Sequence, residues 1–441
     1  MTQPAPSQLD LPRLLSGDAE RARTLAARIA NELATPPAFG AHERAPSATR
    51  WHHQSLSKGA PGIALLHALH AHSDHRSEVV HRWLRHATGS GGLSVGPGAG
   101  LWFGAPALAF AIAMTSPERY PDALATLDAA VITLTETRLA AAWTRIRDAR
   151  RPRLAEFDIV RGMSGLGAYL LRRDPAAPLL REVLAYLVTL TRPLRAARDA
   201  AGPDAPGWWS SDPPPGRSTD SGGHANLGMA HGIAGPLALL ALAVRAGVTV
   251  PGQAEAIDQI TDWLDAWRQN TSAGPWWPEH LTVADLRAGR PAQAEPGRPS
   301  WCYGLPGLAR AQQLAAIARH DRIRQVIAED ILTACLRDAT HLARLTDLTL
   351  CHGWAGMTLT AWMAAADSAT TSGLAALLPD LTHAFLNHAF RDPAADSAHP
   401  ASGTSPPGLI DGRAGIALVA HTFAESASDQ LPAWPSCLLL I

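Results

Sequence analysis

The sequence has little charge, a single lysine and few cysteines. Asp, Glu, Lys and Arg together make up 17% of its 441 residues, and the formal net charge is −1. This balance gives no electrostatic reason to expect a nucleic acid or an anionic membrane surface as partner. Lys58 is the only lysine, so arginine supplies the rest of the positive charge, a bias that we attribute to a GC-rich genome.

Other absences narrow the class of protein further. Four cysteines in a chain of this length exclude a disulfide framework. The first 15 residues lack the basic-then-apolar pattern of a secretion signal. No apolar run reaches transmembrane length without a charge or a helix breaker. We therefore expect a cytoplasmic protein.

A Gly-x-x-Gly motif recurs along the chain, and a run rich in Ala and Leu follows each copy. Neighbouring copies lie about 45 to 70 residues apart, a period typical of repeat architectures. The first glycine suits a turn with unusual backbone angles, and the second lets the helix start lie close to another backbone. Six copies begin at Gly59, Gly162, Gly232, Gly304, Gly353 and Gly412, and a seventh, at Gly104, has lost its second glycine.

The repeat predicts an all-α fold. The runs after the motif are apolar on nearly every side, which is typical of buried helices. The stretches between copies, such as residues 179–196 and 254–269, are amphipathic and predict outer helices with one wet face. One inner and one outer helix per copy favour an α/α toroid with seven inner and seven outer helices. Closure of the ring is inferred from the number of copies.

The extent of the repeat predicts one domain over residues 1–441, although the length alone would allow two or three. Two segments dense in Pro and Gly, residues 200–223 and 271–299, predict long loops before the fourth and fifth copies. These loops should stand at the rim where the motif residues lie. They form either a lid or peptide-contact surface, or they are tolerated insertions.

The residue just before each first glycine should stand at the same end of the toroid in every repeat. Five of the seven residues at this position can carry a charge or serve as metal or proton-transfer groups. Gathered at helix N-termini, they predict a polar mouth that favours anions. They are Lys58, Phe103, Arg161, His231, Tyr303, His352 and Asp411.

Cys302 and Cys351 occupy one repeated position in adjacent copies, and His352 follows Cys351. Zinc favours two thiolates and an imidazole, and three protein ligands leave the open position of a catalytic site. The two thiolates cancel the charge of Zn²⁺, so a third thiolate bound there stays nucleophilic, which favours thiol alkylation over water activation. The alternative is a pair of buried free cysteines and a core histidine, which the regular placement disfavours.

Three more residues are candidates for proton transfer or anion binding. His231 stands at the mouth position of its repeat and can move a proton near neutral pH. Asp158, four residues before Gly162, either joins that chemistry, caps a helix or pairs with Arg161. Arg298, four residues before Cys302, either holds a carboxylate or an enolate, or is a solvated loop arginine.

The motifs around these residues resemble those of the lanthionine synthetase C-like proteins, the lanthipeptide cyclases. The resemblance extends from Ser57 to Gly412. It rests on three motifs, Ala230-His231-Gly232, Trp301-Cys302-Tyr303-Gly304 and Cys351-His352-Gly353.

The resemblance implies an α/α toroid with seven inner helices that holds one Zn²⁺ through Cys302, Cys351 and His352. It also implies that His231 and Asp158 take part in proton transfer at the site. In the same way it implies that Arg298 and Tyr303 line the site.

The implied reaction is a Michael-type addition within a dehydrated precursor peptide. A peptide cysteine adds to a dehydroalanine or dehydrobutyrine and forms lanthionine or methyllanthionine. The sequence has no N-terminal part of several hundred residues that resembles a dehydratase, so we expect a stand-alone cyclase that works with a separate dehydratase. A transporter complex is a further partner that would bring the protein to the membrane periphery.

Three alternatives remain beside the cyclase. An enzyme of the same fold could add glutathione to dehydroamino acids, and a zinc-stabilised toroid could be a scaffold without catalysis. Another toroid enzyme, such as a prenyltransferase or a glycoside hydrolase, is disfavoured. The motifs do not resemble those of prenyltransferases, and a hydrolase needs a well-placed pair of carboxylates.

Overall fold

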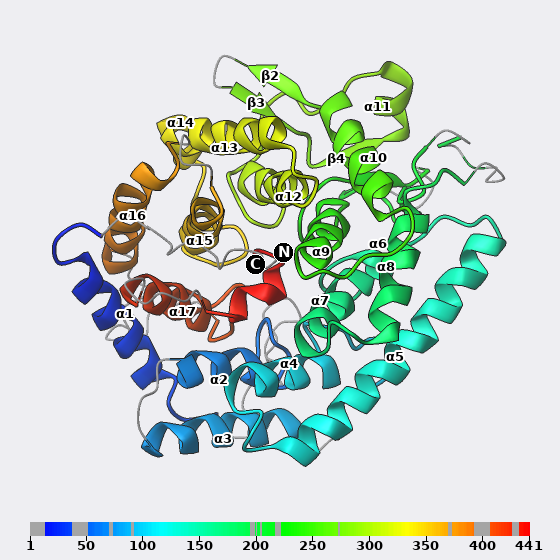
Figure 1. Cartoon of the computed structure of the whole chain (residues 1–441). Helices are drawn as coiled ribbons and strands as arrows, with labels where there is room; N and C mark the ends of the chain where they lie inside the picture. Colours follow the sequence, from blue (N-terminus) through cyan, green and yellow to red (C-terminus); the bar gives the residue numbers. More distant parts are fainter. Residues whose placement is uncertain are drawn as a thin grey trace, which may run out of the picture.

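The helices form a closed double ring in the computed structural model (Figure 1). The structure describes residues 14–37, 52–69, 74–89, 92–194, 199, 201–202, 205–216, 222–271, 274–368, 373–391, 406–425 and 432–441. The inner ring consists of α2 (Ala60–Leu69), α4 (Ala105–Thr115), α7 (Met163–Arg173), α9 (Ala234–Arg245), α12 (Leu305–Ala318), α15 (Trp354–Ala366) and α17 (Arg413–Ala424). The outer ring consists of α1 (Asp18–Glu32), α3 (Asp74–Thr88), α5 (Pro121–Arg147), α8 (Pro178–Leu190), α10 (Gln253–Ala266), α13 (Arg322–Arg337) and α16 (Leu378–Arg391).

Burial separates the two rings as the hydrophobic pattern predicts. In α9 and α15, nearly every residue is buried, because each inner helix has neighbours on all sides. In α10 and α13, buried and exposed positions alternate with helical periodicity, so one face packs inward and the other meets solvent. The predicted α/α toroid is confirmed.

The ring closes through helices from opposite ends of the chain. Six inner helices pack with the outer helix that follows them in sequence, but the outer partner of α17 is α1. Helix α17 also packs against α2, which completes the inner ring. The expectation of one inner and one outer helix per copy therefore fails for the last copy, whose outer helix comes from the other end of the chain. The chain continues past α17 into the centre of the ring, so the outer face of α17 is covered by α1 (Figure 1).

The repeated glycines are explained mainly by close backbone approach. A Cβ on Gly356 would lie 1.8 Å from the carbonyl oxygen of Leu350, and a Cβ on Gly353 would lie 2.3 Å from Asp347. Among the first glycines of the motif, only Gly104 has a positive φ, of 77°. The expectation of unusual backbone angles is thus wrong for the others, which have no positive φ. Gly162, Gly304, Gly353 and Gly412 have an extended backbone that any residue could adopt. They are glycine because a side chain would have no room.

Short strands and short helices lie at the rim of the ring. Strand β1 (His224–Asn226) pairs antiparallel with β4 (His280–Thr282), with Asn226 opposite His280, and β2 (Gln269–Thr271) pairs antiparallel with β3 (Gly274–Trp276). The remaining elements are the helices α6 (Leu154–Phe157), α11 (Val283–Ala288) and α14 (Ala339–Leu342) and the 3-10 helices η3 (Ala375–Leu377) and η5 (Trp434–Leu438).

The two predicted loops differ in structure. Residues 271–299 contain β3, β4 and α11, so this segment is not the continuous loop that its prolines indicate. The sequence pattern does not predict these strands because each has three residues, too few for an alternation of apolar and polar residues to be visible. In the described part of residues 200–223 there is neither a helix nor a strand, and the rest of that segment lies outside the described residues.

Within the described residues, no helix is both long enough and apolar enough to cross a bilayer.

Candidate metal centre and proton-transfer site

A belt of backbone hydrogen bonds brings the two cysteines together at the mouth of the ring. Cys302 stands just before α12, and Cys351 just before α15. The amide of Cys302 donates to the carbonyl of Cys351 over 3.2 Å, and the amide of Cys351 donates to Ile410 over 2.9 Å. In the same way Ala230 donates to Cys302. Equivalent positions of neighbouring repeats are therefore tied to one another around the bore.

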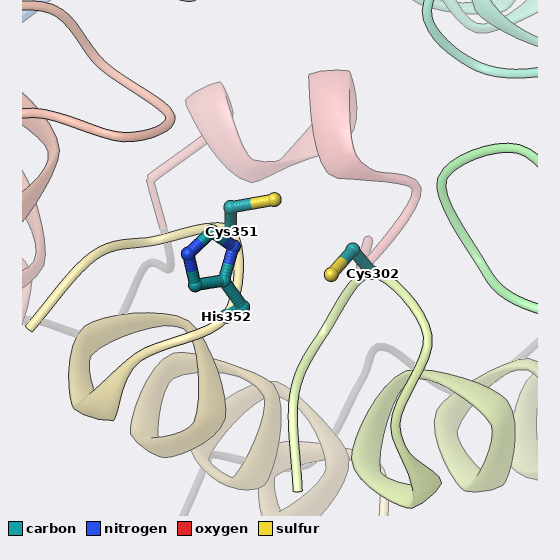
Figure 2. Close-up of side chains that lie close together, drawn as sticks. All are labelled: Cys302, Cys351 and His352. Carbon is teal, nitrogen blue, oxygen red and sulfur yellow. The ribbon is translucent and has the colours of Figure 1, made fainter. Parts of the chain in front are cut away.

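This belt places the predicted ligand atoms in one cluster. One ligand atom from each of Cys302, Cys351 and His352 lies within 4.8 Å of the other two. Figure 2 shows the two sulfurs and the imidazole facing a common space between α12 and α15. Cys302 is buried, whereas Cys351 and His352 are partly exposed, so the cluster is open towards the mouth.

The protonation of the cluster suits a metal that binds thiolates. The Cys351 thiol donates to Cys302 and lowers the pKa of Cys302; His352 and Ser300 act in the same direction, while burial opposes them. The same bond with Cys302 raises the pKa of Cys351. The bond to Cys302 also raises the pKa of His352. These hydrogen bonds therefore favour the thiolate form of Cys302, and two sulfurs with one imidazole are a donor set that fits zinc.

The carboxylate of Asp347 lies beside the imidazole of His352. Its Oδ2 lies 3.4 Å from Nε2 of His352, which leaves Nδ1 as the ring nitrogen for a metal. Its Oδ1 accepts from the amide and the hydroxyl of Thr349, over 2.8 and 2.7 Å, so the carboxylate is fixed. A carboxylate behind a ligand histidine fixes the tautomer and raises the basicity of the ligand.

Arg298 stands beside the same carboxylate. Its Nη1 lies 3.8 Å from Oδ2 of Asp347, and its side chain is 43% exposed. The guanidinium is thus at the cluster and open to the mouth, which agrees better with an anion-binding role than with an isolated loop arginine.

His231 and Asp158 form a direct pair. Nδ1 of His231 lies 2.7 Å from Oδ2 of Asp158, whose side chain is almost fully buried. Oδ1 of Asp158 accepts the backbone amides of Arg161 and Gly162 over 2.7 and 2.8 Å. The carboxylate therefore accepts the amides of the two residues just before α7 with one oxygen and pairs with the imidazole through the other.

Tyr303 lies between the cluster and this pair. Its ring centroid is 6.2 Å from that of His231. Burial raises the pKa of Tyr303 to about 12, although a hydrogen bond with Asn226 lowers it, and the negative charges of the cysteines and of Asp158 add to the rise. The phenol therefore stays protonated and can donate a hydrogen bond.

The structure brings all seven predicted site residues to one end of the ring, and it adds two that the sequence reasoning missed. These are Asp347 and Asn226, which hold His352 and Tyr303. A signal for them exists in the repeat, because Asn226, Arg298 and Asp347 each stand six residues before the first glycine of their copy. Asp411 was assigned to the mouth without a role; burial raises its pKa, and the charges of His352 and Lys58 oppose that rise.

The fold and the site define the class: an α/α toroid whose mouth carries a thiol–imidazole cluster beside an Asp–His pair. Residues 50–439 match the family described as lanthionine synthetase C-like protein, and the chain belongs to this family.

The chain is also similar to a curated sequence and to a solved structure. The nisin biosynthesis protein NisC of Lactococcus lactis subsp. lactis is 25% identical over 136 residues, which are 31% of this chain and 32% of that protein. The match thus spans about a third of the length of this relative. The solved structure of nisin cyclase matches with a TM-score of 0.70 at 20% identity, over 96% of this chain and 98% of that one. This second likeness shows the fold.

Proposed function

We propose that the protein is a zinc-dependent lanthipeptide cyclase. It acts on a dehydrated precursor peptide and forms lanthionine and methyllanthionine rings. The observation that carries the proposal is the cluster of Cys302, Cys351 and His352 beside the His231–Asp158 pair, in a chain of the lanthionine synthetase C-like family. The similarity of the chain to nisin cyclase and to NisC supports the same activity.

Cys302, Cys351 and Nδ1 of His352 would hold the zinc. When bound, zinc lowers the pKa of a substrate thiol and keeps the resulting thiolate nucleophilic. Asp347 keeps His352 in the tautomer that this ligation needs. Because three protein ligands occupy the cluster, one position remains for the peptide cysteine.

The chain's other residues handle the proton and the developing charge. In the reaction a carbon–sulfur bond forms at the β-carbon of the dehydroamino acid, the carbon–carbon double bond opens, and the α-carbon takes up a proton. His231 accepts the proton of the thiol and returns it to the α-carbon, directly or through a water that it positions. Asp158 orients His231 and stabilises its protonated form, as a buried carboxylate behind a histidine does.

Arg298 and Tyr303 complete the site where the carbonyl oxygen of the substrate would lie. As negative charge grows on the carbonyl oxygen of the substrate, the protonated phenol and the half-exposed guanidinium are donors for it. A dehydratase that supplies the peptide, a transporter complex and a cytoplasmic location at the membrane periphery belong to the same proposal.

Metal content and ring formation test the proposal together. We expect about one zinc per purified chain, lost in Cys351→Ala and retained in Cys335→Ala, whose thiol is buried outside the cluster. Ring formation leaves the peptide mass unchanged, so free thiols are counted by alkylation after incubation with dehydrated peptide. Enzyme-free peptide is the blank.

Three results would redirect the assignment. Ring formation at the wild-type rate by the metal-free Cys351→Ala protein contradicts zinc dependence. A glutathione adduct that forms faster than rings, when both are offered, favours the glutathione-adding relative. A folded protein that binds no zinc and forms no rings favours a scaffold.

A further inference from the structure

The end of the chain occupies the bore of the toroid. Helix η5 and residues 439–441 lie at the centre of the inner ring, where Figure 1 shows the C-terminus. Cys437, Leu438 and Leu440 have no exposed surface. Trp434 anchors the start of this segment by donating to Thr422 of α17 over 3.2 Å. We call residues 434–441 the tail.

The tail meets the residue that precedes a predicted metal ligand. Nε1 of Trp301 donates to the carbonyl of Leu438 over 3.1 Å, and Trp301 is joined to Cys302 by a peptide bond. Trp301 is only 2% exposed. Its own carbonyl presses against α12, since a Cβ on Gly307 would lie 2.0 Å from it. The indole and the backbone of Trp301 are therefore both fixed, and the tail fixes the indole.

A second contact ties the tail to both helices that follow the ligand loops. The guanidinium of Arg310, on α12, donates twice to the carbonyl of Leu440, over 3.1 and 2.7 Å. The same guanidinium lies 2.6 Å from Asp367, directly after α15. Arg310 thus joins the tail to α12 and to the C-terminal end of α15, the two helices whose N-terminal loops carry Cys302 and the Cys351–His352 pair.

The backbone of the tail is bent towards these donors. Leu439 has a φ of 53°, in the left-handed region that a buried leucine rarely adopts. Such a conformation persists where the surroundings over-determine it. Among the described residues, the side-chain hydrogen bonds to the carbonyls of Leu438 and Leu440 all come from Trp301 and Arg310.

A cavity of about 490 Å³ lies beside the tail. Leu439 and Ile441 line it together with Arg310 and Asp367. Loss of the last three residues would enlarge this cavity and admit water to the Arg310–Asp367 pair.

From these contacts we propose that the tail is a positioning element for the metal centre, which acts on Cys302 through Trp301 and Arg310. As far as it concerns zinc, this inference rests on the proposed function. As far as it concerns the placement of the Cys302 thiol, it stands without a metal.

Trp301→Phe tests the proposal, because it keeps an aromatic ring and removes the donor to Leu438, together with part of the buried volume of the indole. The matched control is Trp83→Phe, which removes an equivalent bond, from Nε1 of a buried tryptophan to the carbonyl of Leu33 on the outer ring. A chain ended after Leu438 removes the partner of Arg310 as a second, independent variant.

The first measurement is the rate at which iodoacetamide alkylates Cys302 in metal-free protein, followed by peptide mass spectrometry. Cys335 is the internal reference for general loosening. We expect Cys302 to react several-fold faster in Trp301→Phe and in the shortened chain, with Cys335 unchanged. In Trp83→Phe we expect the alkylation rates of Cys302 and Cys335 either to stay as in wild type or to rise together. Equal rates for Cys302 in wild type, Trp301→Phe and the shortened chain would overturn the proposal.

The second measurement is zinc affinity by competition with a chromogenic chelator. We expect a loss of about 10-fold in Trp301→Phe and wild-type affinity in Trp83→Phe. If wild type binds no zinc, the proposed function fails while the alkylation rates still decide the role of the tail. Should the shortened chain fail to fold, Trp301→Phe carries the test.

Discussion

Nδ1 of His231 lies 2.7 Å from Oδ2 of Asp158, while the other oxygen of this carboxylate holds the start of α7. The imidazole is therefore anchored to the inner helix of the preceding repeat and not to its own. His231 and Asp158 lie in two different loops. A backbone hydrogen bond from the amide of Ile159 to the carbonyl of Ala230 also joins these loops. This arrangement fixes the tautomer of His231 and leaves Nε2 to act on a substrate.

Asp158→Asn should therefore lower ring formation without loss of metal. An asparagine can still accept the amides of Arg161 and Gly162, so the fold should persist, but its NH₂ group would face Nδ1 and reverse the tautomer. We expect kcat to fall about 100-fold or more, with KM and zinc content near wild type.

His231→Asn should have an effect of similar size, and the double variant should be no slower than the worse single variant, because the two residues act as a unit. Additive losses in the double variant would mean that the two side chains act separately. The measurement is single-turnover thiol loss on a dehydrated peptide.

Asp347→Asn should weaken metal binding because it removes the carboxylate behind His352. We expect a loss in zinc affinity of about 10- to 100-fold. A matched control is Asp338→Asn, since Asp338 also caps a turn and lies 3.9 Å from a histidine, His341, outside the cluster. Chelator competition on both variants decides the point, and equal affinities in the two would argue against a role for Asp347.

Asp367 should contribute stability that depends on pH. Burial by itself would raise the pKa of Asp367, but the charges of Arg310 and Arg245 outweigh it and hold the pKa below its ordinary value. Because the unfolded value is about 3.9, this stabilisation is complete above that pH and is lost as the pH falls through the folded-state pKa.

Asp367→Asn removes the carboxylate that contacts the buried Arg310 and leaves it only the weaker influence of Glu329, so we expect a cost of about 3 kcal/mol in the free energy of unfolding near pH 7. Urea unfolding at several pH values checks this, and the difference from wild type should shrink below about pH 4. A difference that stays constant with pH would show that the ion pair is not its origin.

Gly356→Ala should damage the fold at the ligand loop itself. The added Cβ would lie 1.8 Å from the carbonyl oxygen of Leu350, the residue before Cys351, so that backbone must move. We expect a loss of about 1–3 kcal/mol or more. Gly98→Ala is the control, because nothing lies within 4 Å of its Cβ position. Thermal unfolding and zinc content are measured on both variants. Equal stabilities of the two would mean that the backbone at the start of α15 moves at little cost.

The sequence by itself determined the helical class, the starts of the inner helices and the shared position of Cys302 and Cys351. These are local properties: hydrophobic period sets which helices are buried, and a repeated glycine marks where each inner helix comes close to the carbonyl six residues earlier. Since the motif recurs, equivalent positions had to gather at one end of the ring, which is why Cys302, Cys351 and His352 could be predicted as a cluster.

Only the tertiary structure decided the contacts between distant segments. The pairing of α1 with α17 and the bond from Trp301 to Leu438 join elements whose local patterns carry no mark of one another. Closure of the ring selects them, because each inner helix must bury its faces against whichever segment the seven-fold geometry brings near. The tail enters the bore for the same reason: its apolar side chains are the ones available to fill the centre that seven helices enclose.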